Sequence, residues 1–422
     1  MNLRSTFATT WIVPTKKDTE RRMKLQIINV VWGDKYTNNF LELSLPTQFS
    51  AGNLRDLSIR PNYIIYTNEA GKKQITSSII YRTLESLCDV IFRIINVSPK
   101  DCPFKILLEG HSDAIAEANK TNSPILFLSP DCVVSTNVFT YCEKAIKRKV
   151  RLIAVCSTRM SLQVYRKYSD AKKKEGSTEA VTWSPQELAT VTVHNLHHRA
   201  KCLLMSKDKI GIHPSHMYWR LDENNLLAKA YHLHPLLFWP EKHNVYPVTS
   251  TDGRDFLEKA YKNFNRWEVI QDCNDFSLFE ISSEDQFLND TSVSKELFPF
   301  RHWLQTSVSK AHQYFYEHDI ILGDGIEKSD WKDKIKAIHE EVKDLHRSPL
   351  FSRDIKQSIK KIQRRLRMTF LFYKTLIRQV FTGKKKLTFR KVFHHAYYLI
   401  RYRTLPYHTL PPSAYDKKNY VK

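Results

Sequence analysis

Several common signatures of enzyme classes are missing from this sequence. It contains no P-loop, no GxGxxG and no GxSxG motif, which weakens an assignment as a kinase, a Rossmann dehydrogenase or an α/β-hydrolase. The metalloprotease motif HExxH is also absent, and the seven cysteines are scattered without a CxxC pair. That distribution argues against a zinc ribbon or a disulfide framework, and it favours reduced thiols in a cytosolic setting.

Long apolar runs are absent as well. No uncharged stretch approaches the ~18–20 apolar residues that a membrane-spanning helix needs. The first residues, MNLRSTFATTWIVPTKKDTERR, lack the apolar core of a signal peptide. We therefore expect a soluble protein, or one that is peripheral to a membrane at most.

Acidic residues are missing from a long stretch near the C-terminus. Residues 355–404 contain fifteen Lys and Arg and no Asp or Glu, within a 422-residue chain of net charge +22. The basic residues alternate with aromatic and aliphatic ones, which suits the surface of an anionic bilayer and equally a nucleic-acid backbone. A helical extension that packs on the body and exposes a basic face is a third interpretation.

Strand and helix patterns alternate in the first half of the chain. The expected strands are 24–31, 62–67, 105–108, 125–128 and 150–156, and the expected helices lie near 36–43, 77–91, 113–119 and 136–148. Because the strands are apolar on both faces, this order predicts an α/β fold with a mainly parallel, doubly wound sheet.

The second half is less regular. Residues 157–183 are polar and lysine-rich, so we expect a mobile excursion there, whereas Ser184-Pro185-Gln186-Glu187 predicts a helix start and a helix to about Leu204. Two apolar-aromatic runs around the turn 222–225 predict a β-hairpin, and 267–272 predicts another strand. The expected domains are a polar leader (1–23), an α/β body (24–285), a mostly helical extension (286–354) and a basic amphipathic tail (355–422).

The stretch 121–135, TNSPILFLSPDCVVS, contains the first candidate site residue. Its apolar strand stops abruptly at Ser129, Pro130 and Asp131. A carboxylate at the carboxyl end of a buried strand lies where α/β proteins usually bind ligands. An ordinary turn with Asp131 facing water is equally compatible with this stretch alone.

The order of these motifs resembles the nucleotide-sugar-binding half of GT-A glycosyltransferases, which have a Rossmann-like fold. The resemblance covers roughly residues 24–285, and further pieces are similar to an uncharacterised group of bacterial glycosyltransferase-like proteins. These pieces are VVWGDKYTNNFLELSLP (30–46), YIIYT (63–67), LFLSPDCVVS (126–135), SPQEL (184–188), PSHMYWRL (214–221) and HLHPLLFWP (232–240).

The resemblance implies a donor site with an incomplete acidic motif. GT-A enzymes usually carry two carboxylates one residue apart that hold a divalent metal on the donor's diphosphate, and here only the second position, Asp131, matches. Either Asp131 holds Mg²⁺ or Mn²⁺ with help from Asp252 or a histidine, or Lys or Arg contacts the diphosphate without metal.

The same resemblance implies that Trp32, Gly33 and Thr67, at the ends of the first two expected strands, face the nucleotide. Core packing is an equally good explanation for Trp32.

Histidines are frequent in the second half, in NLHHRA (195–200), HPSHMYW (213–219) and YHLHPLL (231–237). His232 and His234 would share one face of an extended strand, which suits metal or phosphate contact, although hydrogen-bonded structural histidines are the commoner case. Asp252 is a candidate base on the acceptor side, because inverting transfer needs a group that takes a hydroxyl proton. A turn-forming Asp before Gly253 is the alternative.

Together these patterns predict a cytoplasmic glycosyltransferase, peripheral on the inner face of a bacterial cell membrane. It would move a sugar from a nucleotide-sugar donor to a cell-surface glycan or glycolipid, such as a lipopolysaccharide-type acceptor. The alternative is a non-catalytic α/β scaffold whose basic tail binds nucleic acid or an anionic membrane.

Overall fold

The computed structural model describes residues 24–95, 103–175, 180–205, 215–248, 250–253, 256–287, 304 and 307–347. The expected leader and the basic tail lie outside these residues. The chain divides into two compact units: one comprises Met1–Val293 and Val308–Lys328, and the other comprises Ser294–Ser307 and Ser329–Lys422.

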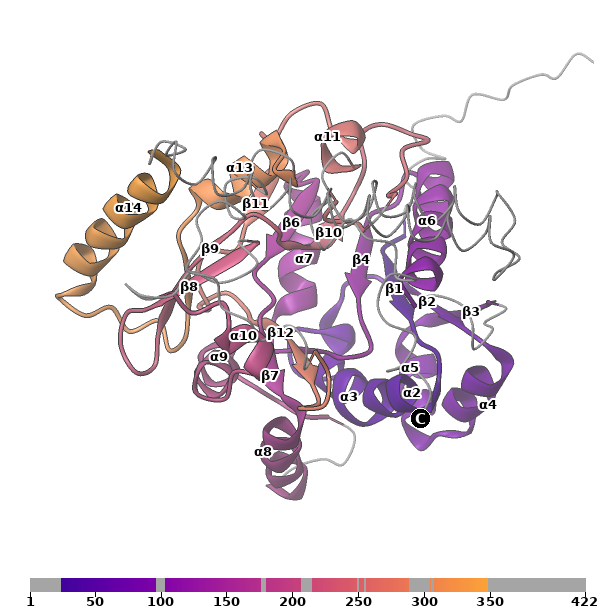
Figure 1. Ribbon diagram of the computed structural model, residues 1–422. Coiled ribbons are helices and arrows are strands. Elements are labelled where there is room, and N and C mark those ends of the chain that lie inside the picture. The colour runs from indigo at the N-terminus through magenta and orange to yellow at the C-terminus, as the bar shows by residue number, and fades with distance from the viewer. Residues whose placement is uncertain are drawn as a thin grey trace, which may run out of the picture. The chain divides into compact units, whose positions relative to one another are not determined.

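The first unit is built on a seven-stranded sheet with the order β11-β6-β10-β4-β1-β2-β3 (Figure 1). Its strands are β1 (Gln26–Val30), β2 (Asn62–Thr67), β3 (Asp89–Ile94), β4 (Ile125–Leu128), β6 (Leu152–Val155), β10 (His234–Phe238) and β11 (Trp267–Val269). Strand β10 runs antiparallel between β4 and β6, and the other neighbouring pairs are parallel. The predicted α/β fold with a mainly parallel sheet is confirmed.

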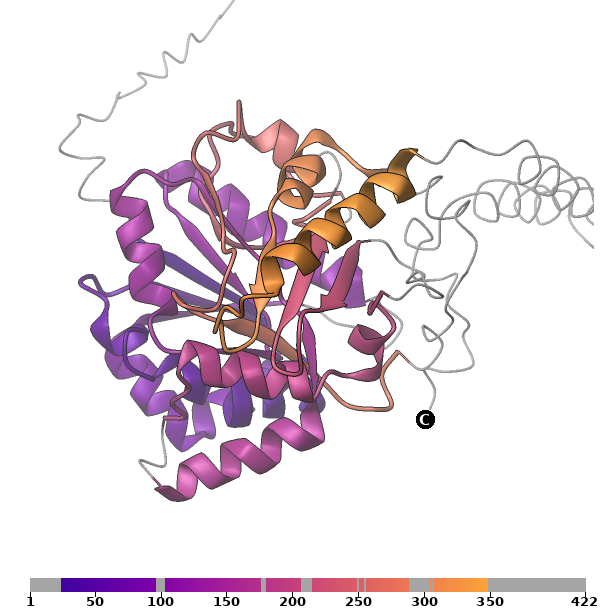
Figure 2. The same cartoon turned by 90° about the vertical axis from the view of Figure 1, so that its left-hand side faces the viewer.

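Helices cover both faces of this sheet (Figure 2). The described helices of the first unit are α2 (Asp34–Asn39), α3 (Leu45–Gln48), α4 (Glu69–Ser77), α5 (Ile79–Leu87), α6 (Pro103–Thr121), α7 (Val138–Lys147), α8 (Leu162–Glu175), α9 (Pro185–His194), α10 (His198–Lys201), α11 (Phe256–Ala260) and α13 (Lys310–Glu317), with a π-helical turn at Phe40–Ser44. Helix α14 (Trp331–Arg347) belongs to the second unit.

Strand β1 shows why both faces need cover. Ile28 and Val30 belong to the apolar cluster that includes Ile115 of α6, whereas Ile27 belongs to the cluster that includes Phe139 of α7. Successive side chains of a strand point to opposite faces. All five residues of β1 are buried, including the polar Gln26 and Asn29, which fits a sheet that is buried on both sides.

The expected strand 105–108 is wrong, because this segment lies inside α6, and the expected short helix 113–119 is part of the same long helix. Ile106 packs in the same cluster as Ala114 and Ile115, so its apolar run belongs to a helix face. A Cβ on Gly110 would lie 3.0 Å from Cγ2 of Val30, which shows how closely α6 approaches the sheet. The third strand is instead β3, which directly follows α5.

The expected excursion at 157–183 is also wrong for most of its length. It contains β7 (Arg159–Ser161) and α8, and Trp183 is buried against Tyr165 with ring centroids 5.9 Å apart. The lysines of α8 thus belong to a helix whose apolar residues are packed. The helix that begins at Pro185 ends at His194 rather than near Leu204, and α10 is separate.

Two small sheets complete the first unit. One has the order β5-β12-β7, with β5 at Cys132–Val134 and β12 at Leu278–Ser282. The other has the order β13-β9-β8, with β8 at His216–Arg220, β9 at Leu226–Ala230 and β13 at Ile320–Leu322. The antiparallel pair β8–β9 confirms the predicted hairpin.

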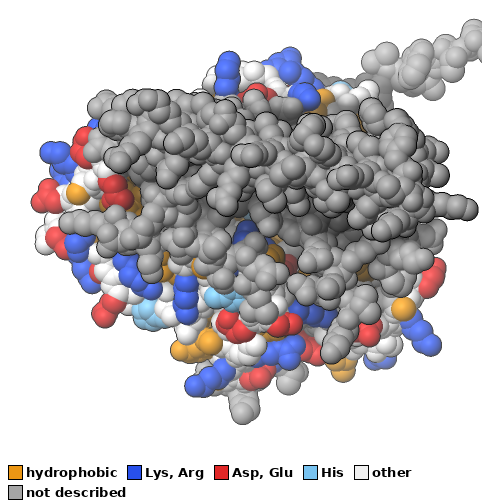
Figure 3. Space-filling model, in the orientation of Figure 1, with side chains coloured by type: hydrophobic (Ala, Val, Ile, Leu, Met, Phe, Trp, Pro, Cys, Tyr) orange, Lys and Arg blue, Asp and Glu red, His pale blue; other side chains and the backbone are white. Residues whose placement is uncertain are grey.

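The surface and the second unit add two observations. Acidic and basic side chains are interspersed over the described part of the face in Figure 3. In the second unit, α14 is a helix within the extension that we expected to be mostly helical (286–354). Among the described residues, none of the helices is both long enough and apolar enough to span a membrane.

Candidate functional site

The order of the strands marks one edge of the sheet as a binding edge. The chain passes from β1 to β2 and β3 on one side, then returns to β4 on the other side of β1, and β1 is parallel to both neighbours. Ligands of open α/β sheets bind outside the carboxyl ends of the strands at such a reversal. The segments after β1 and β4, which contain Gly33 and Asp131, therefore meet at the same edge.

The turn after β1 leaves room for a ligand. Gly33 is exposed, has φ +74°, and a Cβ built on it would meet no atom within 4 Å. Trp32 is only partly buried; it packs against the apolar core and lies 6.2 Å from the ring of Tyr36. Core packing thus accounts for part of this side chain, and contact of the rest with a nucleotide stays a prediction.

Thr67 lies deeper than the resemblance implies. It is buried at the end of β2, and a Cβ on Gly71 of α4 would lie 2.3 Å from its Oγ1. Within the described ranges this hydroxyl has no hydrogen-bond partner. Its place against α4 makes Thr67 a weaker candidate for nucleotide contact than Gly33.

Asp131 lies in a charged cluster that the sequence did not reveal. Arg159 of β7 approaches Asp131 with Nη1 to Oδ2 at 3.8 Å, and its Nη2 contacts the carboxylate of Glu280 on β12. Arg159 and Glu280 are paired in register across β7 and β12, while the hydroxyl of Ser129 donates to Oδ1 of Asp131 at 2.6 Å. Two carboxylates therefore share one guanidinium at the binding edge.

Burial and the charges around it alter the pKa of Glu280. Burial raises the pKa of Glu280 to about 7, the carboxylates of Asp131 and Asp252 act in the same direction, and Arg159 opposes them. Burial by itself would lower the pKa of Arg159, but Glu280 and Asp131 raise it above its usual value. Arg159 therefore stays charged, while Glu280 can exchange a proton near neutral pH.

Asp252 pairs with one of the two predicted histidines. Nδ1 of His232 lies 3.5 Å from Oδ2 of Asp252, and His312 of α13 stacks on His232 with ring centroids 4.3 Å apart. His312 also bonds through Nε2 to the backbone oxygen of Asp252 at 2.9 Å. Although burial opposes it, the interaction with His232 holds the pKa of Asp252 well below its usual range.

His234 has a different role from its neighbour. It is the first residue of β10, and its Nε2 donates to the backbone oxygen of Phe127 on β4 at 2.7 Å. His232 precedes that strand, so the two histidines do not act as a pair on one strand face. Burial lowers the pKa of His234, which fits a neutral imidazole that joins two strands.

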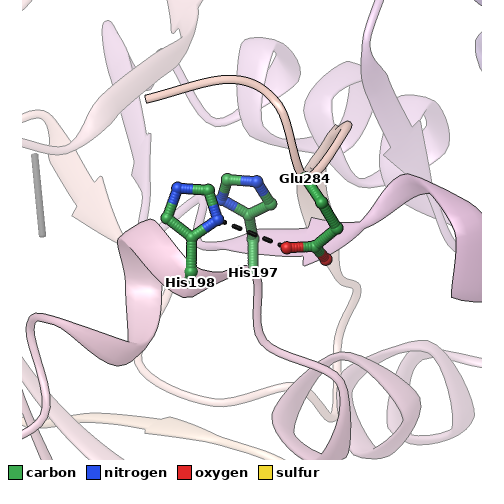
Figure 4. A group of neighbouring side chains, drawn as sticks. All are labelled: His197, His198 and Glu284. Atoms are coloured by element: carbon green, nitrogen blue, oxygen red, sulfur yellow. Dashed lines mark hydrogen bonds and ion pairs between the residues drawn. The ribbon is translucent and has the colours of Figure 1, made fainter. Parts of the chain in front are cut away.

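A second cluster of possible ligands lies next to Arg159. His197, His198 and Glu284 each offer one ligand atom, and these atoms lie within 4.8 Å of one another (Figure 4). The backbone N–H of His197 donates to the oxygen of Arg159 at 2.9 Å. The sequence showed the adjacent histidines of NLHHRA, but Glu284 is 86 positions away from His198 and had no visible connection to them.

Known proteins of similar sequence or structure do not assign this chain to a family. No family model matches the sequence, and neither does any curated protein. Among solved structures, S. aureus TarS is similar at 14% identity over 69% of this chain and 41% of that one, with a TM-score of 0.33.

Two further similar structures have shorter matches. Mouse xyloside xylosyltransferase 1 has 13% identity over 36% of this chain and 57% of that one, with a TM-score of 0.20. A putative glucose-1-phosphate thymidylyltransferase from Bacillus anthracis has 12% identity over 32% and 55%, with a TM-score of 0.22. This chain spans less than half of TarS, and at these identities and TM-scores none of the three similarities identifies a family or an activity.

Proposed function

We propose that this protein is a glycosyltransferase that uses a nucleotide-sugar donor. The observation that carries the proposal is the place of Asp131 and Arg159, which lie together where the strand order reverses. The sequence motifs that resemble GT-A enzymes belong to the same edge, since Trp32 and Gly33 follow β1. An α/β sheet with such an edge is suited to hold a nucleotide and its phosphates.

In the proposed donor site, the open turn at Gly33 admits the nucleotide, and Trp32 offers a partly exposed ring for a base. Arg159 supplies positive charge for the diphosphate, whose negative charge grows as the sugar leaves. A guanidinium can contact a phosphate through two parallel hydrogen bonds. To contact the diphosphate, the Arg159 guanidinium would have to give up part of its contact with Glu280 or with Asp131.

Asp131 also fits a divalent metal, but only as a single ligand. Its Oδ2 faces Arg159 and its Oδ1 accepts from Ser129. Mg²⁺ and Mn²⁺ sites commonly combine one or two carboxylates with substrate phosphates and water. A metal bound there would neutralise the diphosphate, while Asp131 would orient it and Arg159 would still balance Glu280.

The acceptor side of the proposal rests on Asp252 and Glu280. Asp252, with His232 beside it, is the base that the sequence suggested, but a low pKa makes a carboxylate a weak base. Glu280 has the better-matched pKa and is a second candidate. His234, whose Nε2 is used between β4 and β10, is proposed to position this region rather than to react.

The acceptor and the location remain part of the proposal. A cell-surface glycan or glycolipid acceptor, and a place on the inner face of the cell membrane, are supported by the basic amphipathic pattern of residues 355–404. The alternative, a non-catalytic scaffold with a nucleic-acid-binding or membrane-binding tail, depends on that same pattern.

The deciding experiment is a thermal-shift screen of the full chain against UDP-, GDP-, CMP- and dTDP-sugars, with EDTA or with Mn²⁺. A ligand that binds only the folded state raises the Tm. We expect one nucleotide class to raise it, the shift to be lost in Asp131→Ala, and the shift to persist in the control Asp170→Ala, an exposed position on α8. No shift with any donor would favour the scaffold. A shift that survives in Asp131→Ala would place the donor elsewhere.

A further inference from the structure

Two consecutive imidazoles and one carboxylate converge beside the candidate donor site. His197 is the N-cap of α10, with extended backbone angles, and His198 is the first residue of that helix. Their ring centroids lie 3.9 Å apart. Glu284 follows β12 and directs its carboxylate towards the two rings (Figure 4). Three potential ligands thus come from two segments that are far apart in the sequence.

The distances within this cluster are close to those of a metal site. Nδ1 of His198 lies 3.3 Å from Oε2 of Glu284. Zinc–nitrogen and zinc–oxygen bonds of ~2.0–2.2 Å at a tetrahedral angle place two ligand atoms about 3.4 Å apart. The most distant of the three candidate ligand atoms is still within 4.8 Å of the others, so small side-chain rotations would bring all three to one ion.

The hydrogen bonds around the cluster favour the same interpretation. Nε2 of His197 bonds to the backbone oxygen of Ser283 at 3.0 Å. A metal-binding histidine commonly uses its other ring nitrogen in this way, since the bond fixes both the tautomer and the ring orientation. The other ring nitrogen of His197 makes a longer hydrogen bond, in which Nδ1 accepts from the N–H of Arg199 at 3.3 Å. That contact is weak enough to be exchanged for a metal bond.

The second ring nitrogen of His198 is unsatisfied. Nε2 of His198 is buried and has no hydrogen-bond partner among the residues that the structure describes. A buried polar atom without a partner costs free energy. An ion pair between His198 and Glu284 would explain the position of Nδ1, but it does not explain the close approach of the His197 ring. An ion bound at Nδ1 would leave Nε2 to a water molecule or another small ligand.

We propose that His197, His198 and Glu284 form a binding site for a transition-metal cation of the Zn²⁺ class. Two imidazoles and one carboxylate suit Zn²⁺ better than Mg²⁺ or Ca²⁺, which prefer oxygen ligands. Three protein ligands leave a fourth position for water or another small ligand. This site is separate from a metal at Asp131 and does not depend on the proposed transferase activity.

The bound ion would hold the segment after β12 against α10. Strand β12 carries Glu280, which contacts Arg159 of β7, and His197 is bonded through its backbone to Arg159. A metal that joins Glu284 to His197 and His198 would therefore fix the geometry of the Arg159–Glu280 pair. The expected role is positional, because the three ligands themselves are not needed to contact a substrate.

The test is Zn²⁺ binding by the full, untagged chain after removal of metal with EDTA and dialysis. We expect competition with a chromophoric chelator to show a site in the wild type that weakens at least tenfold in His198→Ala and in Glu284→Gln. The control His243→Ala removes an exposed histidine outside the cluster and should bind Zn²⁺ like the wild type. Co²⁺ in place of Zn²⁺ should give visible absorption typical of a four-coordinate ion, and this too should be lost in both variants.

Circular dichroism separates loss of the site from loss of the fold. Glu284 is half exposed, with 50% of its side chain accessible, so Glu284→Gln should keep the wild-type spectrum. Wild-type protein that takes up no Zn²⁺ would overturn the proposal. Folded Glu284→Gln that binds Zn²⁺ as tightly as the wild type would overturn it as well. Binding of nucleotide sugars is measured separately in EDTA, so failure of either proposal leaves the other testable.

Discussion

The guanidinium of Arg159 lies 3.8 Å from the carboxylate of Asp131, and the same guanidinium contacts Glu280. Asp131 follows the central strand β4, whereas Arg159 and Glu280 belong to the small sheet beside it. A fixed positive charge therefore stands next to the one carboxylate that matches the GT-A acidic motif. Removing the charge of Asp131, Arg159 or Glu280 should change both the free energy of unfolding and the proposed donor site.

Replacing Arg159 with Gln should destabilise the fold, because two partly buried carboxylates would lose their shared cation. Breaking a buried ion pair from one side costs about 3–5 kcal/mol, and partial exposure of these side chains reduces this to about 2–3 kcal/mol. Urea unfolding at pH 7.5 measures the change. Arg159→Lys is the matched control: it keeps the charge but lacks the planar group that contacts two partners, so its loss should be smaller. Equal losses in the two variants would contradict the charge argument.

The raised pKa of Glu280 predicts a specific pH dependence. A carboxyl group with a folded pKa near 7 and an unfolded pKa near 4.3 binds more protons when folded. Its contribution to stability is therefore fully present below about pH 4 and is lost as the pH rises to about 7. Glu280→Gln stays neutral, so its stability relative to the wild type should increase by up to roughly 3 kcal/mol across that window.

Urea titrations at several pH values measure that difference, with Asp252→Asn as the comparison. The pKa of Asp252 is lowered, so its stabilising contribution is lost only in stronger acid, as the pH falls through that lowered pKa. A flat difference between Glu280→Gln and wild type from pH 4.5 to 7 would contradict the raised pKa. If Glu280 is the base of the proposed transfer, Glu280→Gln should also remove the acidic limb of the activity profile.

His111 should make the protein sensitive to acid. Burial lowers its pKa to about 3, and His234 acts in the same direction; its ring packs on Phe127 with centroids 4.7 Å apart. The unfolded chain binds a proton that the folded chain excludes, so stability falls as the pH drops from about 6.5 towards 3. His111→Phe keeps an aromatic ring and should reduce the pH slope of stability by about one proton between pH 6 and 4. An unchanged slope would show that His111 is not held neutral.

Gly52 and Gly33 form a matched pair for a backbone test. Both have positive φ, +72° and +74°, but a Cβ on Gly52 would lie 2.2 Å from Oδ1 of Asn137, whereas one on Gly33 would meet open space. Gly33→Ala should cost about 1–3 kcal/mol of stability through backbone strain. Gly52→Ala should cost about 1–3 kcal/mol more, because the methyl group also displaces Asn137. Similar Tm values for the two variants would contradict this, because they would show that Asn137 moves away from the added methyl group at little cost in stability.

Local patterns in the sequence were enough for most of the central sheet. The run 125–128 is β4 to the residue, and the runs at 24–31, 62–67 and 150–156 contain β1, β2 and β6. These strands are short, apolar and bounded by turn residues, so the signal for each lies within a few neighbouring positions. The same locality explains the errors. KILL at 105–108 looks like a strand, but it is one stripe of the 19-residue helix α6, and short apolar runs do not distinguish the two.

The sequence by itself determined the α/β class and the place of Asp131 at the carboxyl end of a buried strand, because strands and their ends follow from local periodicity and turns. The strand order that brings this end beside the end of β1 is a property of the tertiary structure. Only the tertiary structure decided what surrounds Asp131. Arg159 is 28 positions away and Glu280 is 149, and pairing between β7 and β12 brings them together. Likewise, Glu284 meets His197 and His198 only through folding. Periodicity carries no information about such partners, because the free energy that selects them comes from burial and charge pairing between distant segments.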